Sequence, residues 1–188
     1  MSRDHGKGRS KLIVVLDWVV TIAVALLLTF LLRLYVGEPF VVPSGSMLET
    51  IQLDDRFWGE KISYHFREPE RGDIVTFMNP DGSDKVLVKR VIATEGQTVD
   101  LIDGYVYVDG ERLDEPYTLG KPSDPLIKQM PGIEPITYPL TVPEGCVWVM
   151  GDNRTNSADS RYFGPVEKST ITSRAMFTFW PLSDARVL

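Results

Sequence analysis

Hydrophobic and polar positions divide the chain into two parts with different patterns. From Leu12 to Leu32 the residues are apolar except for Asp17 and two threonines, and residues 18–32 carry no charge. About 20 consecutive apolar residues are enough to cross the core of a bilayer as a helix. Beyond residue 37, short runs of alternating hydrophobic and polar residues are separated by turn residues, which is typical of β-strands.

The N-terminal apolar run is predicted to be an uncleaved membrane anchor at residues 12–36. A cleavable signal peptide also begins with a basic stretch and an apolar run. This run is long for that role, however, and residues 33–39 lack a convincing pair of small residues for cleavage. Four basic residues and one acidic residue lie in residues 1–11. The positive-inside rule therefore predicts a cytoplasmic tail at residues 1–11 and an exterior domain at residues 37–188.

The alternating runs predict that the exterior domain is all-β or nearly so. Asn79-Pro80-Asp81-Gly82 and Asp109-Gly110 have the chemistry of tight turns. No long helical periodicity follows the anchor, and residues 114–145 are rich in proline, which predicts an irregular insertion or a set of edge loops. The expected strands span residues 73–77, 85–92, 105–108, 146–150 and 170–180.

Charge and residue usage exclude several classes of function. From Leu34 onward the chain has 15 basic and 24 acidic side chains, which argues against nucleic acid as its main partner. Cys146 is the single cysteine, so no disulfide can form within the chain, and we expect a small buried hydrophobe in a strand. His5 precedes the anchor and His65 lies in an aromatic run, so a catalytic site built on histidine is disfavoured.

A neutral lysine is the remaining way to activate a serine. A serine hydroxyl is a poor nucleophile until a base removes its proton, and lysine becomes such a base when burial lowers its pKa. The stretch PSGSMLET at residues 43–50 offers Ser44 and Ser46. Lys89 is flanked by apolar residues on an expected strand, but alternation places Lys85 on the same face. Position alone therefore leaves both lysines open, although Lys85 lies nearer to the turn.

Three segments resemble bacterial type I signal peptidases, which are membrane-anchored serine proteases that cut signal peptides from exported preproteins. The segments are PSGSM at 43–47, RGDIV at 71–75 with VKRVI at 88–92, and GDNRTNSADSRYFG at 151–164. Their order and their position after an apolar run match the family as well. The resemblance implies a mainly β fold, with a signal-peptidase/LexA-like catalytic domain of coiled antiparallel sheets, and it implies no metal or cofactor.

Position by position, the resemblance implies that Ser46 is the nucleophile and Lys89 the general base. It implies that the Ser44 hydroxyl helps to form the oxyanion hole and that Ser157 orients the lysine. The implied supporting residues are Asp152, Asn153 and Arg154, which would shape a turn beneath the site, and the ion pair of Asp159 and Arg161. The expected wall of the substrate pocket is formed by Phe40, Val42, Pro43 and Val88.

The expected function is removal of signal peptides at the outer face of the cytoplasmic membrane, close to lipid and to the secretion machinery. Two positions depart from the family pattern, Glu49 where proline is usual and Thr155 where aspartate is common. A self-cleaving LexA-like domain is disfavoured, because the apolar run stands where a DNA-binding module would be. A non-enzymatic, membrane-tethered β domain is the other alternative. The aromatic run at residues 177–180 fits either a buried strand or a contact with the membrane surface.

Overall fold

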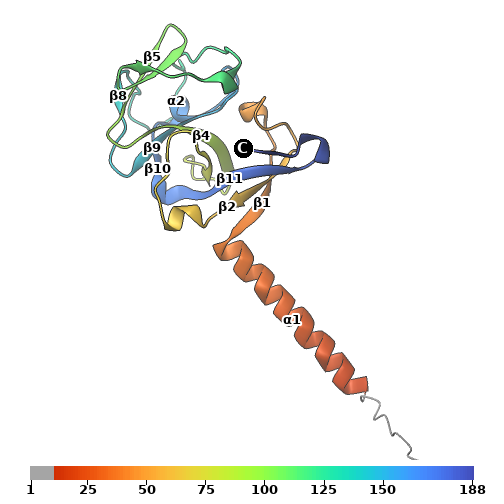
Figure 1. Ribbon diagram of the computed structural model, residues 1–188. Coiled ribbons are helices and arrows are strands. Elements are labelled where there is room, and N and C mark those ends of the chain that lie inside the picture. Colours follow the sequence, from red (N-terminus) through yellow and green to blue (C-terminus); the bar gives the residue numbers. More distant parts are fainter. Residues whose placement is uncertain (1–10) are drawn as a thin grey trace, which may run out of the picture. The chain divides into compact units, whose positions relative to one another are not determined.

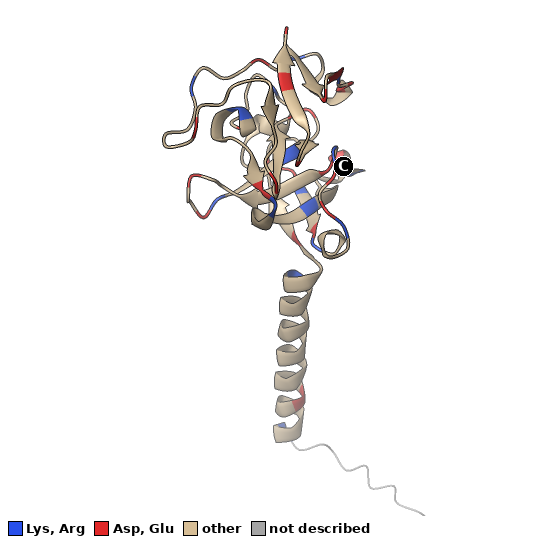
Figure 2. Cartoon of the chain, turned by 90° about the vertical axis from the view of Figure 1, so that its left-hand side faces the viewer, with Lys and Arg blue, Asp and Glu red and all other residues tan. Residues whose placement is uncertain are grey.

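A computed structural model describes residues 11–188, which form a helix and a β domain (Figure 1). The helix α1 (Lys11–Tyr35) is long and apolar enough to cross a membrane. Its 25 residues extend about 37 Å at 1.5 Å per residue, compared with about 30 Å for a bilayer core. In Figure 2 few positions along it have the colour of a charged residue. The predicted tail at residues 1–11 lies outside the described residues, apart from Lys11.

The β domain, residues 37–188, consists of two antiparallel sheets. The larger sheet contains β1 (Gly37–Val41), β2 (Arg56–Glu60), β3 (Ile74–Met78), β4 (Val86–Thr94), β9 (Cys146–Met150), β10 (Val166–Glu167), β11 (Ile171–Trp180) and β12 (Arg186–Val187). Its strand order is β1-β2-β11-β3-β4-β9-β10, and β12 pairs with β11. This arrangement confirms the mainly β fold, with β1 as an edge strand and β4 inside the sheet.

The smaller sheet has the strand order β7-β6-β5-β8. Its strands are β5 (Thr98–Ile102), β6 (Tyr105–Val108), β7 (Glu111–Arg112) and β8 (Leu140–Thr141). The short helical elements of the domain are α2 (Ser160–Phe163) and the 3-10 turns η1 (Gly45–Met47), η2 (Ser63–His65), η3 (Pro116–Thr118), η4 (Lys168–Thr170) and η5 (Leu182–Asp184). Between η3 and β8, residues 119–139 contain neither helix nor strand.

Two Asp-Gly turns connect the strands of the smaller sheet. Asp109 and Gly110 both have positive φ, 54° and 81°, and join β6 to β7. Asp103 and Gly104 join β5 to β6 in the same conformation, with φ of 50° and 79°. Positive φ at both central positions suits the right-handed twist of a tight hairpin. The first of these turns was predicted from the sequence, and the second was not.

Packing in the core follows the two faces of β9. Trp148 and Met150 belong to a cluster shared with the smaller sheet, while Val147 and Val149 pack with β3, β10 and α2. Adjacent residues of a strand point to opposite faces. Since both faces of β9 are covered, all four side chains are fully buried. The adjacent β4 is thereby held in a rigid part of the domain.

A third apolar cluster fixes the segment that follows β1. Val42, Met47 and Ile51 are each no more than 1% exposed and pack against Phe57 of β2. Burial of side chains of this size contributes about 1.5–3 kcal/mol each. Because Met47 belongs to η1, the cluster holds this short turn against the larger sheet.

Seven strands are absent from the set expected from the sequence, namely β1, β2, β5, β7, β8, β10 and β12. In β1 the sequence is GEPFV, and a proline and a glycine weaken a pattern typical of a strand. Pro39 is tolerated because β1 lies at the edge of its sheet, where one row of N–H groups needs no strand partner. β1 therefore forms because β2 pairs with it, and the residue pattern of β1 alone does not reveal this pairing.

Candidate active site

Ser46 lies in η1 and is 7% exposed. Two hydrogen bonds hold the backbone on either side of it. The Asn153 side-chain amide donates to the Gly45 carbonyl at 2.8 Å, and the Asn153 backbone N–H donates to the Ser46 carbonyl at 3.0 Å. With Met47 buried in the core, the serine is fixed both from beneath and from the 151–161 loop.

Lys89 reaches Ser46 from β4. Its Nζ lies 2.8 Å from Ser46 Oγ and 2.9 Å from the Val88 carbonyl oxygen, and the residue is 3% exposed. By contrast, Lys85 precedes β4 and is exposed. The structure thus separates two lysines that strand alternation alone left equivalent.

Burial lowers the pKa of Lys89 from 10.5 to about 8. The charges of Asp159 and Asp152 act in the opposite direction, but loss of hydration has the larger effect. Each of these carboxylates is also paired with an arginine, Arg161 and Arg90 respectively, which weakens its influence. An appreciable fraction of the amine is therefore neutral near pH 7 to 8, as proton removal from a serine requires.

Asp152 organises the face of β4 opposite to Lys89. Its carboxylate accepts hydrogen bonds from Arg90 Nε at 2.8 Å and Nη2 at 2.6 Å, and a further one from the Thr50 hydroxyl. Alternation along β4 puts the side chain of Arg90 on the face opposite to Lys89, but it does not identify a charged partner for Arg90. A charged residue on a largely buried strand requires one, and this was the available signal for the contact with Asp152.

Asp159 and Arg161 form an ion pair that is almost wholly buried. Arg161 Nε lies 2.9 Å from Asp159 Oδ1, and the two side chains are 1% and 0% exposed. The same carboxylate accepts the Gly151 N–H at 3.0 Å, while Arg161 Nη2 donates to the Arg154 carbonyl at 2.7 Å. The pair therefore determines the path of the 151–161 loop beneath Ser46.

Ser157 lies behind the nucleophile, next to Gly151. A Cβ added at Gly151 would overlap both Ser157 Oγ and the Ser46 carbonyl oxygen, so all three positions adjoin. The Ser157 hydroxyl is buried and makes no hydrogen bond in the described part of the chain. The structure thus brings Ser157 to the site without the expected hydrogen bond to Lys89, and an orienting role stays a prediction.

The remaining predicted residues differ in how much surface they present. Ser44 is exposed and extended, with φ −142° and ψ 153°, and its side chain does not cap η1. Pro43 is exposed, and Phe40 and Val88 are half-buried beside the third cluster. Val42 is 1% exposed, so it offers almost no surface to a peptide. Its assignment to the wall of a substrate pocket stays a prediction.

Two contacts of the site could not be predicted from the sequence. Lys121 Nζ donates to Asn153 Oδ1 at 2.9 Å, and Arg154 Nη1 donates to Glu115 Oε2 at 2.9 Å. Both partners come from the irregular region after β7, where periodicity carries no information about distant contacts. Within residues 11–188, no three His, Cys, Asp or Glu side chains are grouped so as to hold a metal ion.

Comparison with known proteins agrees with this arrangement. A family model described as signal peptidase, peptidase S26, matches residues 15–180. The chain is 44% identical over 167 residues to the probable signal peptidase I-1 of Synechocystis sp., covering 85% of this chain and 80% of that protein. It is 36% identical to signal peptidase I T of Bacillus subtilis, over 91% of this chain and 88% of the relative.

A solved structure is also similar to this chain. It is a signal peptidase I from Enterococcus faecalis, 35% identical, with a TM-score of 0.46 over 57% of this chain and 97% of that one. The family match spans both α1 and the β domain, and it includes Ser46, Lys89 and the 151–161 loop. The chain therefore belongs to the signal peptidase family, peptidase S26.

Proposed function

We propose that this protein is a membrane-anchored serine endopeptidase that removes signal peptides from exported preproteins. The observation that carries the proposal is the buried contact of 2.8 Å between Lys89 Nζ and Ser46 Oγ, in a chain of the signal peptidase family. A hydrogen-bonded base beside a hydroxyl is the arrangement that nucleophilic catalysis requires.

In the proposed reaction, Ser46 attacks the carbonyl carbon of the scissile peptide bond while neutral Lys89 takes the hydroxyl proton. Lys89 then protonates the leaving amine, and an acyl-enzyme remains on Ser46. Water then attacks the ester while Lys89 takes a proton from it, and Lys89 returns this proton to Ser46 Oγ as the carboxylic acid product leaves. The backbone N–H of Ser46 and the hydroxyl of Ser44 stabilise the oxyanion, where one such donor is worth on the order of 3 kcal/mol.

The substrate binds as an extended strand next to Ser46. Among residues 11–188, β1 pairs only with β2, so its other edge is open there. β9 pairs with β4 from Arg90 onward, which leaves one side of Val86–Lys89 without a strand partner in the described residues. Open edges of this kind accept an added peptide strand. Half-buried Phe40 and Val88 line the adjoining pocket, which suits small side chains such as alanine.

The membrane anchor supports the choice of substrate. α1 ends at Tyr35 and β1 begins at Gly37, so the catalytic domain is attached directly to the anchor. The basic residues at 1–11 support a cytoplasmic N-terminus and a β domain on the outer side of the cytoplasmic membrane. Signal peptides of exported preproteins emerge there, close to the secretion machinery.

Exposed apolar side chains at the end of the larger sheet support contact with lipid. Trp180, Leu182 and Val187 are 52%, 76% and 84% exposed, and Phe177 pairs with Val187 across β11 and β12. Tryptophan is enriched at membrane interfaces. The aromatic run is therefore more exposed than an ordinary core strand, and we assign it to the membrane surface.

Cleavage of a preprotein by the purified full-length protein tests the function. Ser46→Ala and Lys89→Met are expected to lower kcat at least about a thousandfold, because each removes one half of a unit that acts together. Lys85→Met is the matched control, since Lys85 is exposed and precedes β4. Mass spectrometry of the products identifies the cut. Normal processing by Ser46→Ala would refute the proposal.

A further inference from the structure

The segment of residues 115–121, which follows β7, contacts Asn153 and Arg154 of the 151–161 loop directly. It reaches the preceding residue, Asp152, through Arg90. Glu115 accepts two hydrogen bonds from Arg154. The ring of Tyr117 lies under the Arg90 guanidinium at 4.1 Å, and Arg90 in turn binds Asp152. Lys121 binds Asn153. Each of these loop residues is thus reached by the segment, directly or through one side chain.

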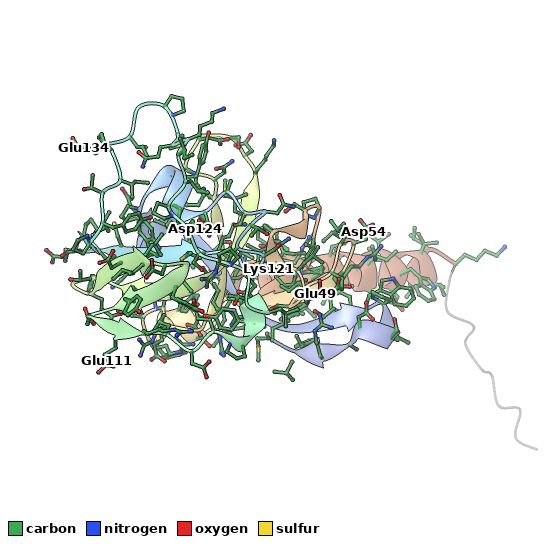
Figure 3. All side chains as sticks on the ribbon, turned by 90° about the horizontal axis from the view of Figure 1, so that it is seen from above. Glu49, Asp54, Glu111, Lys121, Asp124 and Glu134 are labelled. Carbon is green, nitrogen blue, oxygen red and sulfur yellow. The ribbon has the colours of Figure 1, made fainter. Side chains whose placement is uncertain are left out.

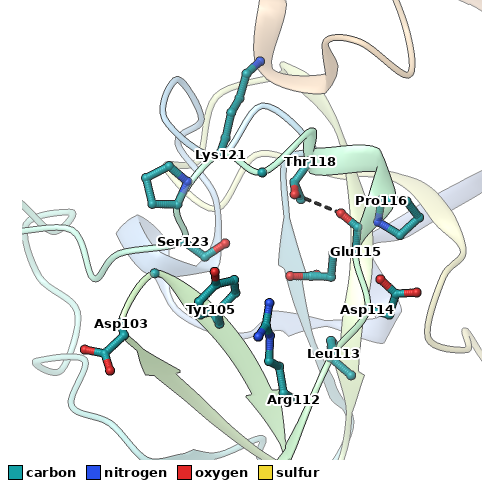
Figure 4. A pocket seen from close by; sticks show the side chains of 13 residues that line it. Asp103, Tyr105, Arg112, Leu113, Asp114, Glu115, Pro116, Thr118, Lys121 and Ser123 are labelled. Atoms are coloured by element: carbon teal, nitrogen blue, oxygen red, sulfur yellow. Dashed lines mark hydrogen bonds between the residues drawn. The ribbon is translucent and has the colours of Figure 1, made fainter.

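The segment is itself firmly attached. Arg154 is 1% exposed and its guanidinium binds both Glu115 and the hydroxyl of Ser123. Glu115, Lys121 and Ser123 line one cavity of about 220 Å³ (Figure 4). In Figure 4 the Lys121 side chain extends away from the cavity, toward the segment drawn in pale orange. In the view of Figure 3, Lys121 lies between the smaller sheet and the segment that bears Glu49.

The Lys121 contact determines which way round the Asn153 amide lies. Lysine has three donors and no acceptor, so it bonds only to Oδ1. The other end of the amide, Nδ2, then donates to the Gly45 carbonyl at 2.8 Å. With the amide reversed, two donors would meet at Lys121 and two acceptors at Gly45. The ammonium thus excludes the reversed orientation.

We propose that Lys121 is a positioning residue of the active site, acting through Asn153 on the backbone of Gly45 and Ser46. This inference rests on the proposed function, since it concerns the reaction at Ser46. Without the lysine only the Gly45 carbonyl selects the orientation of the amide, so the bond to Gly45 is held less firmly. The separation of Ser46 Oγ and Lys89 Nζ then varies, and small displacements of reacting groups lower the rate strongly.

The test uses the full-length protein, a preprotein substrate and a double-mutant cycle. Lys121→Met is expected to lower kcat about tenfold with KM within about twofold of wild type, the size expected for one hydrogen bond to a charged group. Lys121→Arg restores most of kcat, because a guanidinium also only donates. In an Asn153→Ala background, Lys121→Met has little further effect, since the residue through which Lys121 acts is missing.

Lys168→Met is the matched control. Lys168 is also partly buried and paired, to Glu68 and Glu95 at 3.0 Å each, but it makes none of the active-site contacts described above. It should leave kcat unchanged. Wild-type kcat in Lys121→Met, or an equal loss of kcat with and without Asn153, would overturn the inference. If Ser46→Ala still abolished cleavage in the same experiment, the proposed function would stand. Cleavage by Ser46→Ala would instead refute the proposed function, on which the inference rests.

Discussion

Lys89 Nζ lies 2.8 Å from Ser46 Oγ, although the two residues are 43 positions apart in the chain. The lysine is on a strand inside the larger sheet, and the serine is on a 3-10 turn anchored by Met47. Neither side chain is more than 7% exposed. Their burial together is what converts an ordinarily charged lysine into a base.

Activity is expected to fall as the pH is lowered through the pKa of Lys89, about 8. The neutral amine is the active form, so kcat/KM at pH 6 should be roughly one-hundredth of its plateau above pH 9. The measurement is a pH profile of preprotein cleavage, with thermal melting at each pH to show that the domain stays folded. Full activity at pH 5 would contradict a lysine base.

Ser157→Ala is expected to lower kcat about tenfold or more without lowering the free energy of unfolding. The buried hydroxyl has no hydrogen-bond partner among the described residues, so its removal leaves none of their polar groups unsatisfied. Its loss matters only if it bonds to Lys89 during the reaction. Ser160→Ala is a useful contrast, because that hydroxyl accepts the Val149 N–H and its loss should cost about 1–3 kcal/mol. Unchanged kcat in Ser157→Ala would exclude the orienting role.

Gly151→Ala is expected to abolish most activity. The added methyl would overlap the Ser46 carbonyl oxygen and Ser157 Oγ, both of which belong to the site. Overpacking of this kind typically costs about 1–3 kcal/mol, and here it displaces the nucleophile itself. Gly45→Ala is the matched control, since its methyl meets only the end of the Leu48 side chain, at 3.0 Å. Equal kcat values for the two variants would show that the close approach at Gly151 is unimportant.

Asp159→Ala is expected to lower the free energy of unfolding by about 3–5 kcal/mol, because it leaves the guanidinium of Arg161 buried and without its carboxylate. Urea unfolding followed by tryptophan fluorescence measures the loss. Glu68→Ala removes one of the two carboxylate partners of Lys168, a side chain that is 74% exposed, and should change stability by less than about 1 kcal/mol. Similar values for the two variants would mean that the buried pair does not support the loop.

Local patterns were sufficient for several elements of the fold. The apolar run predicted α1, and the alternating runs predicted β3, β4, β6, β9 and β11 within a few residues. Five-residue β1, with Gly37 and Pro39, has no such signature and exists because β2 pairs with it. No local pattern predicts the contact of Lys121 either, because Lys121 lies in a segment without helix or strand and Asn153 is 32 positions away.

The sequence by itself determined the class of the protein, because hydrophobic periodicity is local and the motif residues stand in fixed order. It also offered Ser44, Ser46, Lys85 and Lys89 as candidates, and the family resemblance singled out Ser46 and Lys89 among them. The tertiary structure alone decided the protonation of Lys89, since desolvation depends on what surrounds the amine and not on its neighbours in sequence. It likewise brought Asn153 to the Gly45 carbonyl, Arg90 to Asp152 and Lys121 to Asn153, because these contacts join segments that fold together from distant parts of the chain.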